Sequence, residues 1–191
     1  MVSEILRPKE LFKQIDNQGC LFACFCMMRT AYKPEERIDY SQVEKKLYDT
    51  AYALYPNYAL AKSAAFVRTF PDTKLTMFVD NDELAPYLKG INEEEAIAIQ
   101  QQNINSDWVL EQVNIGNPLT VYVDKTQLPP FELAHDSHFV LIYQEEKGEA
   151  YYADPNFGKA YKLSPEQLEY SIGVFKYLMN WSPVAIGMEV R

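Results

Sequence analysis

Residues 14–32 form the stretch QIDNQGCLFACFCMMRTAY, whose larger part is apolar on nearly every side. The segment 20–32 contains no Gly or Pro and is too long for an ordinary strand, so it predicts a buried helix. Gly19 precedes this helix and Pro34 follows it, and proline disfavours helical geometry at the residue before it. The sequence therefore predicts that a helix at 20–32 lies inside the molecule.

Periodicity predicts the other elements of the chain. Helical spacing predicts further helices or helical turns at 41–55, 83–88, 93–102 and 108–114. Alternating or β-branched apolar runs predict strands at 74–79, 118–124, 138–143, 149–154, 160–163 and 184–190. A last helix is expected after Ser164, because Ser caps it, Pro165 suits its first position and Gln167 can reach back to the cap. Residues 57–65 fit either a helix or irregular structure. With helices first and an antiparallel sheet second, this order predicts an α+β fold.

Length, composition and charge limit the class of protein. A chain of 191 residues favours a single domain over 1–191, and 48% apolar with 24% charged residues is typical of a globular protein. The net charge of -9 argues against nucleic acid or an anionic membrane surface as the main partner. No apolar run is long enough to span a bilayer, and the N-terminus has charges where a signal peptide needs apolar residues. We therefore expect a protein that is cytoplasmic, or exported without a cleavable signal peptide.

The three cysteines fall within seven positions, at Cys20, Cys24 and Cys26, so they cannot staple long loops as a disulfide scaffold does. Cys20 stands at the expected N-terminus of the helix, where free N–H groups and the helix dipole lower the pKa of a thiol. Cys24 and Cys26 lie deeper in the helix, where thiols behave as small inert hydrophobes. Cys26 points away from the other two and no fourth cysteine exists, so neither a metal nor another cofactor is expected.

A cysteine nucleophile needs a base, and His135 and His138 are the two histidines of the chain. His138 begins an apolar strand, which would hold its ring rigidly at the strand end. A hairpin between residues 138 and 154 would bring Asp154 to the same edge, where its carboxylate could orient the imidazole; Asn156 is the alternative. Gln14, six residues before Cys20, is the candidate donor to the oxyanion that develops on the attacked carbonyl.

Several of these segments resemble the C39-like branch of the papain-like cysteine peptidases. Residues 14–20, followed by an apolar helix ending in Ala31-Tyr32, are similar to the family's N-terminal motif of Gln, five residues and Asp-Cys-Gly before a helix. The strand at 138–143, HFVLIY, and the turn at 154–156, DPN, are similar to the family's His-Phe-Val-Val strand and Asp-Pro turn. Residues 116–121 and 162–168 resemble two further family segments, so the likeness covers about residues 10–190.

The resemblance implies a papain-like fold in which N-terminal helices, with the nucleophile at a helix start, pack on a C-terminal antiparallel sheet. Carried over by position, it implies Cys20 as nucleophile, His138 as general base, Asp154 as the group that orients the base and Gln14 as oxyanion donor. Two positions depart from the family: Gly19 stands where Asp is usual and Leu21 where Gly is usual. The family's substrate preference therefore does not carry over.

A second register of the same motif places Gln18 six residues before Cys24. It would make Cys24 the nucleophile, shorten the helix and leave residues 21–23 in an exposed loop. The cost of exposing Leu21 and Phe22 disfavours this register.

Taken together, the motifs predict a thiol hydrolase that attacks an amide or peptide carbonyl of a protein or peptide substrate through an acyl-enzyme. A cysteine protease and a side-chain amidase such as a glutamine deamidase both fit, and a bacterial effector or toxin is compatible with them. An acyltransferase on the same triad stays open. So does a catalytically inactive binding or adaptor domain, whose cleft would be blocked by Leu21, Phe22, Phe25, Met27 and Met28. A regulatory subunit that uses the Tyr-rich segment 48–58 as an interface is a third alternative.

Overall fold

The apolar segment of the sequence forms helix α1 (Cys20–Tyr32), in which every residue from Cys20 to Thr30 is buried. The computed structural model describes residues 6–51, 57–129, 135–179 and 181–191. The other α-helices in these ranges are α2 (Tyr40–Ala51), α3 (Tyr58–Thr69), α4 (Leu84–Ile91), α5 (Ser106–Asn114) and α6 (Pro165–Gly173). A 3-10 turn, η1 (Lys125–Gln127), and a π-helical turn, η2 (Val174–Leu178), complete them. The helix predicted at 41–55 is α2, and its last predicted residues lie outside the described ranges.

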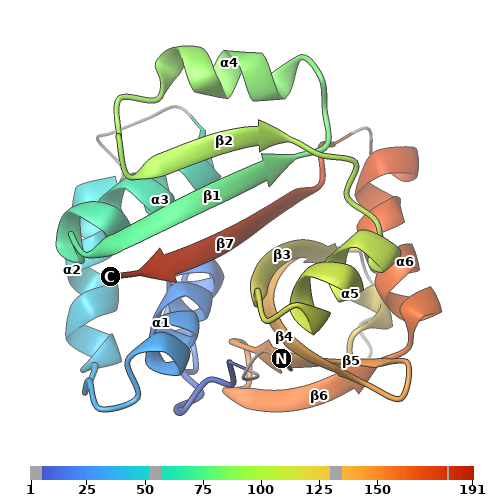
Figure 1. Ribbon diagram of the computed structural model, residues 1–191, viewed down its shortest axis with the longest axis horizontal. Helices are drawn as coiled ribbons and strands as arrows, with labels where there is room; N and C mark the ends of the chain where they lie inside the picture. Colours follow the sequence, from blue (N-terminus) through green and yellow to red (C-terminus); the bar gives the residue numbers. More distant parts are fainter. Residues whose placement is uncertain (1–5, 52–56, 130–134, 180) are drawn as a thin grey trace.

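In the described part of the chain, seven strands form one mixed sheet (Figure 1). They are β1 (Thr73–Val79), β2 (Ile97–Gln101), β3 (Leu119–Asp124), β4 (Ser137–Glu146), β5 (Glu149–Asp154), β6 (Lys159–Leu163) and β7 (Val184–Val190). Their order across the sheet is β2-β1-β7-β3-β4-β5-β6. The pair β1–β2 is parallel, and every other pair is antiparallel. The mixed α/β architecture is thus present, but the sheet begins in the middle of the chain and is not wholly antiparallel.

Strand β2 contradicts the helix predicted at 93–102. Residues 97–101 pair in register with residues 75–79 of β1, so their backbone groups bond to a neighbouring strand. Ile97 and Ile99 are buried and Ala98 between them is exposed, which is the two-residue period of a strand. The acidic and Gln-rich flanks favour a helix locally, and pairing with β1 overrides that preference.

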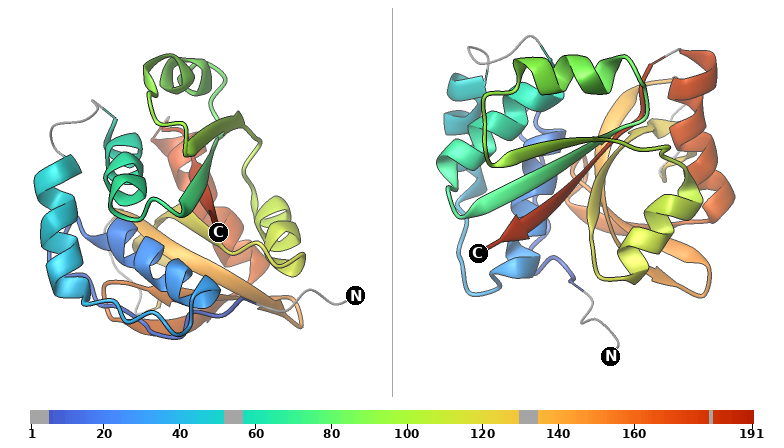
Figure 2. Two further views of the ribbon diagram at one scale, coloured as in Figure 1. Left: turned by 60° about the vertical axis from the view of Figure 1, so that its left-hand side comes forward. Right: turned by 45° about the horizontal axis from the view of Figure 1, so that its top comes forward.

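Both faces of the sheet are covered, as β4 shows by alternation. Phe139, Leu141 and Tyr143 belong to the core formed with α1, α2 and α3, while Val140 and Ile142 belong to the core formed with α5 and α6. Figure 2 shows these two helix groups on opposite sides of the sheet. The N-terminal helices therefore pack on one face only, and helices from later in the chain cover the other.

Several local signals from the sequence appear in the structure as expected. Ser164 and Gln167 form the capping box of α6, with Pro165 at its first position. Strands β4 and β5 are joined at Lys147 and Gly148, which both have positive φ, as a tight hairpin requires. Residues 57–65, for which the sequence fits either a helix or irregular structure, lie almost wholly in α3. The side chain of Asn57 caps this helix. Among the described residues, no helix combines the length and apolar character that a membrane span requires.

Candidate active site

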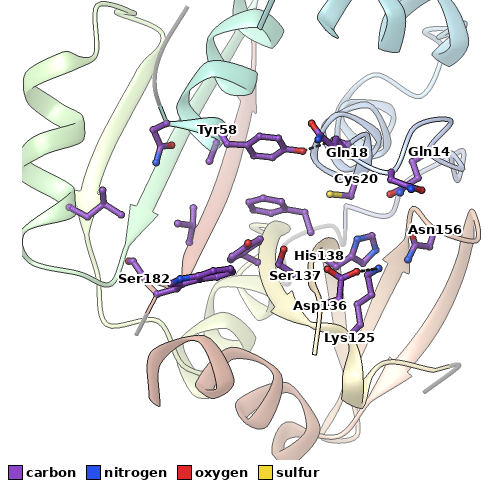
Figure 3. Close-up of a pocket in the computed structure, with 18 residues that line it drawn as sticks. Gln14, Gln18, Cys20, Tyr58, Lys125, Asp136, Ser137, His138, Asn156 and Ser182 are labelled. Atoms are coloured by element: carbon purple, nitrogen blue, oxygen red, sulfur yellow. Dashed lines mark hydrogen bonds and ion pairs between the residues drawn. The ribbon is translucent and has the colours of Figure 1, made fainter. Parts of the chain in front are cut away.

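Cys20 is the first residue of α1 and lines a pocket of about 650 Å³ (Figure 3). Gly19 precedes it as N-cap and has no side chain that could accept a hydrogen bond from the first N–H groups of the helix. The N–H groups of the first turn and the positive end of the helix dipole favour a negative charge at this point. The helix start therefore stabilises a thiolate at Cys20.

His138, the second residue of β4, lines the same pocket and interacts with the Cys20 thiol. Burial raises the pKa of Cys20, but the hydrogen bond and charge of His138, a hydrogen bond from the backbone of Phe139 and the charge of Lys62 together lower it below its usual value. Burial lowers the pKa of His138, but its hydrogen bonds to Asp154 and Cys20 raise it above its usual value. Both net shifts favour a thiolate–imidazolium pair.

Asp154, the last residue of β5, holds the other side of the imidazole. His138 Nε2 lies 2.8 Å from Asp154 Oδ1, and both side chains are buried. The same Oδ1 accepts the backbone N–H of Asn156 at 2.8 Å, while the backbone oxygen of Asp154 accepts the N–H of Gly158 at 2.9 Å. The turn after β5 thus fixes the carboxylate, and with Nε2 engaged, Nδ1 is the ring nitrogen left for Cys20. Asn156, the alternative to Asp154, supports it through its backbone instead.

Gln14 reaches the pocket from the loop before α1. Its backbone N–H donates to the oxygen of Pro155 at 2.7 Å, which ties this loop to the turn beside Asp154. Its side chain lines the same pocket as Cys20 (Figure 3), and its Oε1 is buried without a hydrogen-bond partner in the described part of the chain. The partner that Oε1 lacks is a hydrogen-bond donor, so a ligand that brings an N–H or O–H group to it gains free energy.

The structure does not bring His135 and the other two cysteines into this site. The half-exposed His135 ring lies 3.2 Å from the carboxylate of Asp124 and does not line the pocket. Cys24 and Cys26 are free and fully buried, and burial raises the pKa of both thiols. Residues 21–23 lie inside α1 and are fully buried, which differs from the exposed loop that the second register requires.

The substitution Cys24→Ala distinguishes the register in which Cys20 is the nucleophile from the register in which Cys24 is. Cys24 Sγ donates to the backbone oxygen of Phe139 at 3.4 Å inside the core. We expect Cys24→Ala to lower the free energy of unfolding by about 1 kcal/mol, because it leaves a small cavity, and to leave the reactivity of Cys20 unchanged. Urea denaturation and per-cysteine alkylation measure the two effects. Loss of Cys20 labelling in the folded variant would contradict the assignment.

The walls of the pocket carry amides, hydroxyls and aromatic rings. Its amide and hydroxyl side chains include Asn17, Gln18, Asn57, Ser137, Asn156 and Ser182, and its rings belong to Tyr58, Tyr122, Phe139 and Trp181. Leu21, Phe22 and Phe25, which the adaptor alternative expected to block the cleft, are fully buried and are not among these walls. The Cys20 side of the pocket is therefore open to a ligand. In the described ranges, no three His, Cys, Asp or Glu side chains converge as metal ligands do.

Two buried charges near Cys20 were not singled out from the sequence. Lys62 of α3 contributes to the lowered pKa of Cys20, and burial lowers its own pKa to about 8. Glu44 of α2 is buried too, and a Cβ at Gly19 would lie 1.8 Å from its Oε1. Glu44 belongs to no motif. The small apolar residues around Lys62, in ALAKSAAF, are the one sequence signal that the side chain is buried.

The fold is shared with a solved structure. The chain is similar to the crystal structure of a "putative C39-like peptidase from Bacillus anthracis", with a TM-score of 0.53 and 12% sequence identity over 99% of each chain. No protein-family model matches the sequence, and a search of the curated proteins finds no match. At this identity the likeness establishes the mixed α/β fold and nothing finer.

Proposed function

We propose that this protein is a thiol hydrolase of papain-like, C39-like type, which attacks an amide or peptide carbonyl with Cys20. The observation that carries the proposal is the chain of contacts at the pocket: Cys20 at a helix N-terminus interacts with His138, whose other ring nitrogen lies 2.8 Å from Asp154. Nucleophile, base and orienting group in this order are the requirement for nucleophilic catalysis by a thiol. The neighbour's description as a peptidase agrees with this proposal.

In the first half of the reaction, the Cys20 thiolate attacks the carbonyl carbon and the carbonyl oxygen becomes negative. The backbone N–H of Cys20 and the side-chain amide of Gln14 would donate to that oxygen. His138 then gives its Nδ1 proton to the leaving nitrogen, the C–N bond breaks, and a thioester remains on Cys20. In the second half, His138 takes a proton from water, the hydroxide adds to the thioester, and the acid leaves as the thiolate returns.

The proposed substrate is a protein or a peptide, and the bond that Cys20 attacks is either a backbone amide or a side-chain amide. The mechanism is the same for both, and transfer of the acyl group to an amine instead of water would make the protein an acyltransferase. Products separate these cases: a cut chain for a peptidase, an unbroken chain with released ammonia for a deamidase, and a new amide for a transferase.

Alkylation with iodoacetamide from pH 5 to 9, mapped to each cysteine by mass spectrometry, tests the proposal. We expect Cys20 alone to react at pH values below those at which an ordinary thiol reacts, because its pKa is lowered, and this reactivity to be lost in His138→Ala. Cys24 and Cys26 serve as internal controls, since burial raises the pKa of both. If no cysteine of the native protein reacts below pH 8, the adaptor alternative takes the place of the hydrolase.

The rate of hydrolysis is expected to follow a bell-shaped pH profile. Below the lowered pKa of Cys20 the thiolate is protonated, so the rate falls on the acid side. Above the raised pKa of His138 the ring has lost the proton that the leaving group needs, so the rate falls on the alkaline side. Between the two values both groups are charged and the rate is maximal. Initial rates across this range measure the profile, and a rate that rises steadily to pH 10 would contradict the ion pair.

A further inference from the structure

The loop of residues 14–19, called here the oxyanion loop, carries Gln14 at one end and leads into Cys20 at the other. Side chains of α2 and α3 contact this loop, and on each helix they are spaced four positions apart. On α2, the Tyr40 hydroxyl donates to the oxygen of Gly19 at 3.3 Å, and the Tyr48 hydroxyl donates to Asp16 Oδ1 at 3.2 Å. Glu44, whose carboxylate is buried, lies midway between these two tyrosines on the same helix.

Glu44 holds the first half of the oxyanion loop. Its Oε2 and Oε1 accept the backbone N–H of Ile15 at 3.1 and 3.3 Å, directly after Gln14. The carboxylate also fills the space beside Gly19 that a side chain at this position would need. Glu44 is 2% exposed, although the loop that it holds lies at the surface. Burial raises the pKa of Glu44 more than its hydrogen bonds lower it, so the carboxyl is buried at a cost, and its contact fixes the residue that follows the oxyanion donor.

Lys62 holds the second half of the loop. Its Nζ donates to the backbone oxygen of Gln18, two residues before Cys20, and to the hydroxyl of Tyr58. The ammonium lies 4.0 Å from the ring centre of Tyr58 and 4.7 Å from that of Phe22, in contact with aromatic faces. The charged groups whose fields reach it are Cys20, Asp16 and Glu44. Its positive charge therefore serves the thiolate and the loop together.

We propose that Glu44 and Lys62 are positioning residues for the proposed hydrolase, on which this inference rests: Glu44 keeps Gln14 at the oxyanion site, and Lys62 keeps the end of the loop and a positive charge beside Cys20. Neither side chain is assigned a contact with the substrate. Glu44 acts through the Ile15 N–H and the space beside Gly19. Lys62 acts through the Gln18 carbonyl and its field at the thiol.

Two chemical probes separate these roles without knowledge of the natural substrate. Iodoacetamide alkylates a thiolate by displacement of iodide and forms no oxyanion, so it reports the ionisation of Cys20. With p-nitrophenyl acetate, the thiolate adds to the acetyl carbonyl, the C–O bond breaks and p-nitrophenolate leaves, so the step passes through an oxyanion. The ratio of acylation to alkylation rates therefore reports the oxyanion site, and the alkylation profile alone reports the thiolate.

For Glu44, we expect Glu44→Ala to lower the acylation-to-alkylation ratio of Cys20 about tenfold, because Gln14 is no longer held in place. Glu44→Gln, which keeps the volume and one acceptor oxygen, should restore most of the ratio, and Glu35→Ala at an exposed position is the matched control. A second variant probes the same contact from the other side. Gly19→Ala places a methyl group where the Glu44 carboxylate lies and should also lower the ratio.

For Lys62, we expect Lys62→Met to raise the pH midpoint of Cys20 alkylation by about one unit, because the thiolate loses a positive neighbour. Lys62→Arg, which keeps the charge, should leave the midpoint near that of the unchanged protein. Lys45→Met, the same change at an exposed position of α2, should not move it.

The outcomes divide cleanly between the two proposals. If the unchanged protein is not acylated at Cys20 at all, the proposed hydrolase is overturned. If it is acylated but the ratio is the same in Glu44→Ala and in Gly19→Ala, Glu44 does not position the oxyanion loop. If the alkylation midpoint is the same in Lys62→Met, Lys62 does not act on Cys20.

Discussion

Replacing Cys20 with Ala is expected to abolish amide hydrolysis, with a loss of about 10⁴-fold or more, while the protein stays folded. The thiolate is the only group in the proposed mechanism that forms a bond to the substrate, so no neighbouring side chain can replace it. Cys20→Ser is expected to be nearly as inactive, because a hydroxyl stays protonated under conditions in which the lowered pKa of Cys20 gives a thiolate. Peptide cleavage, ammonia release and p-nitrophenyl acetate turnover together cover the substrate alternatives.

The thermal stability of Cys20→Ala gives an independent check of the same site. The lowered pKa of Cys20 and the raised pKa of His138 mean that the folded state favours the charged pair near neutral pH, so Cys20→Ala removes a contribution to stability. We therefore expect a small fall in the Tm of Cys20→Ala near neutral pH. Full hydrolytic activity in Cys20→Ala would overturn the proposed function, and a large fall in Tm would mean that Cys20 is mainly a core residue.

A helix or strand can be predicted from the sequence alone when it depends only on its own residues. The limits of α1 follow from its own residues, because an uninterrupted apolar run between Gly19 and Lys33-Pro34 admits one interpretation. Strand β2 does not follow in this way. The residues around it, EEEAIAIQQQ, favour a helix in isolation and become a strand because β1 offers a parallel edge.

The residues of the candidate site differ in the same way, because some stand in local motifs and others are placed by helix packing. Cys20, His138 and Asp154 stand in short motifs at element ends, and the hairpin of β4 and β5 brings two of them together by local connectivity. Glu44 and Lys62 belong to no motif, because their positions near the oxyanion loop depend on how α2 and α3 pack beside α1. A buried charge placed by helix packing leaves little trace in a single sequence beyond the apolar residues around it.

Changing Asp154 to Asn is expected to lower the maximal rate of hydrolysis on the order of 10²-fold and to narrow its pH profile from both sides. Asn keeps an oxygen that can accept from His138 Nε2 but removes the negative charge. The pKa of His138, which Asp154 helps to raise, should therefore fall, and the alkaline limb should move to lower pH. With less imidazolium beside it, the pKa of the Cys20 thiol should rise, so the acid limb moves to higher pH.

Asp124 provides the matched control for Asp154, since it is a second buried carboxylate and faces the other histidine of the chain. His135 Nδ1 lies 3.2 Å from Asp124 Oδ1 and Oδ2, and neither residue lines the pocket. Asp124→Asn should therefore leave the pH profile unchanged, even though it removes the same charge from an equally buried place. If Asp124→Asn and Asp154→Asn lower the rate alike, the loss comes from general destabilisation. If only Asp154→Asn narrows the profile, the charge acts through His138 on the ionisation of Cys20, which a purely structural role for Asp154 would not produce.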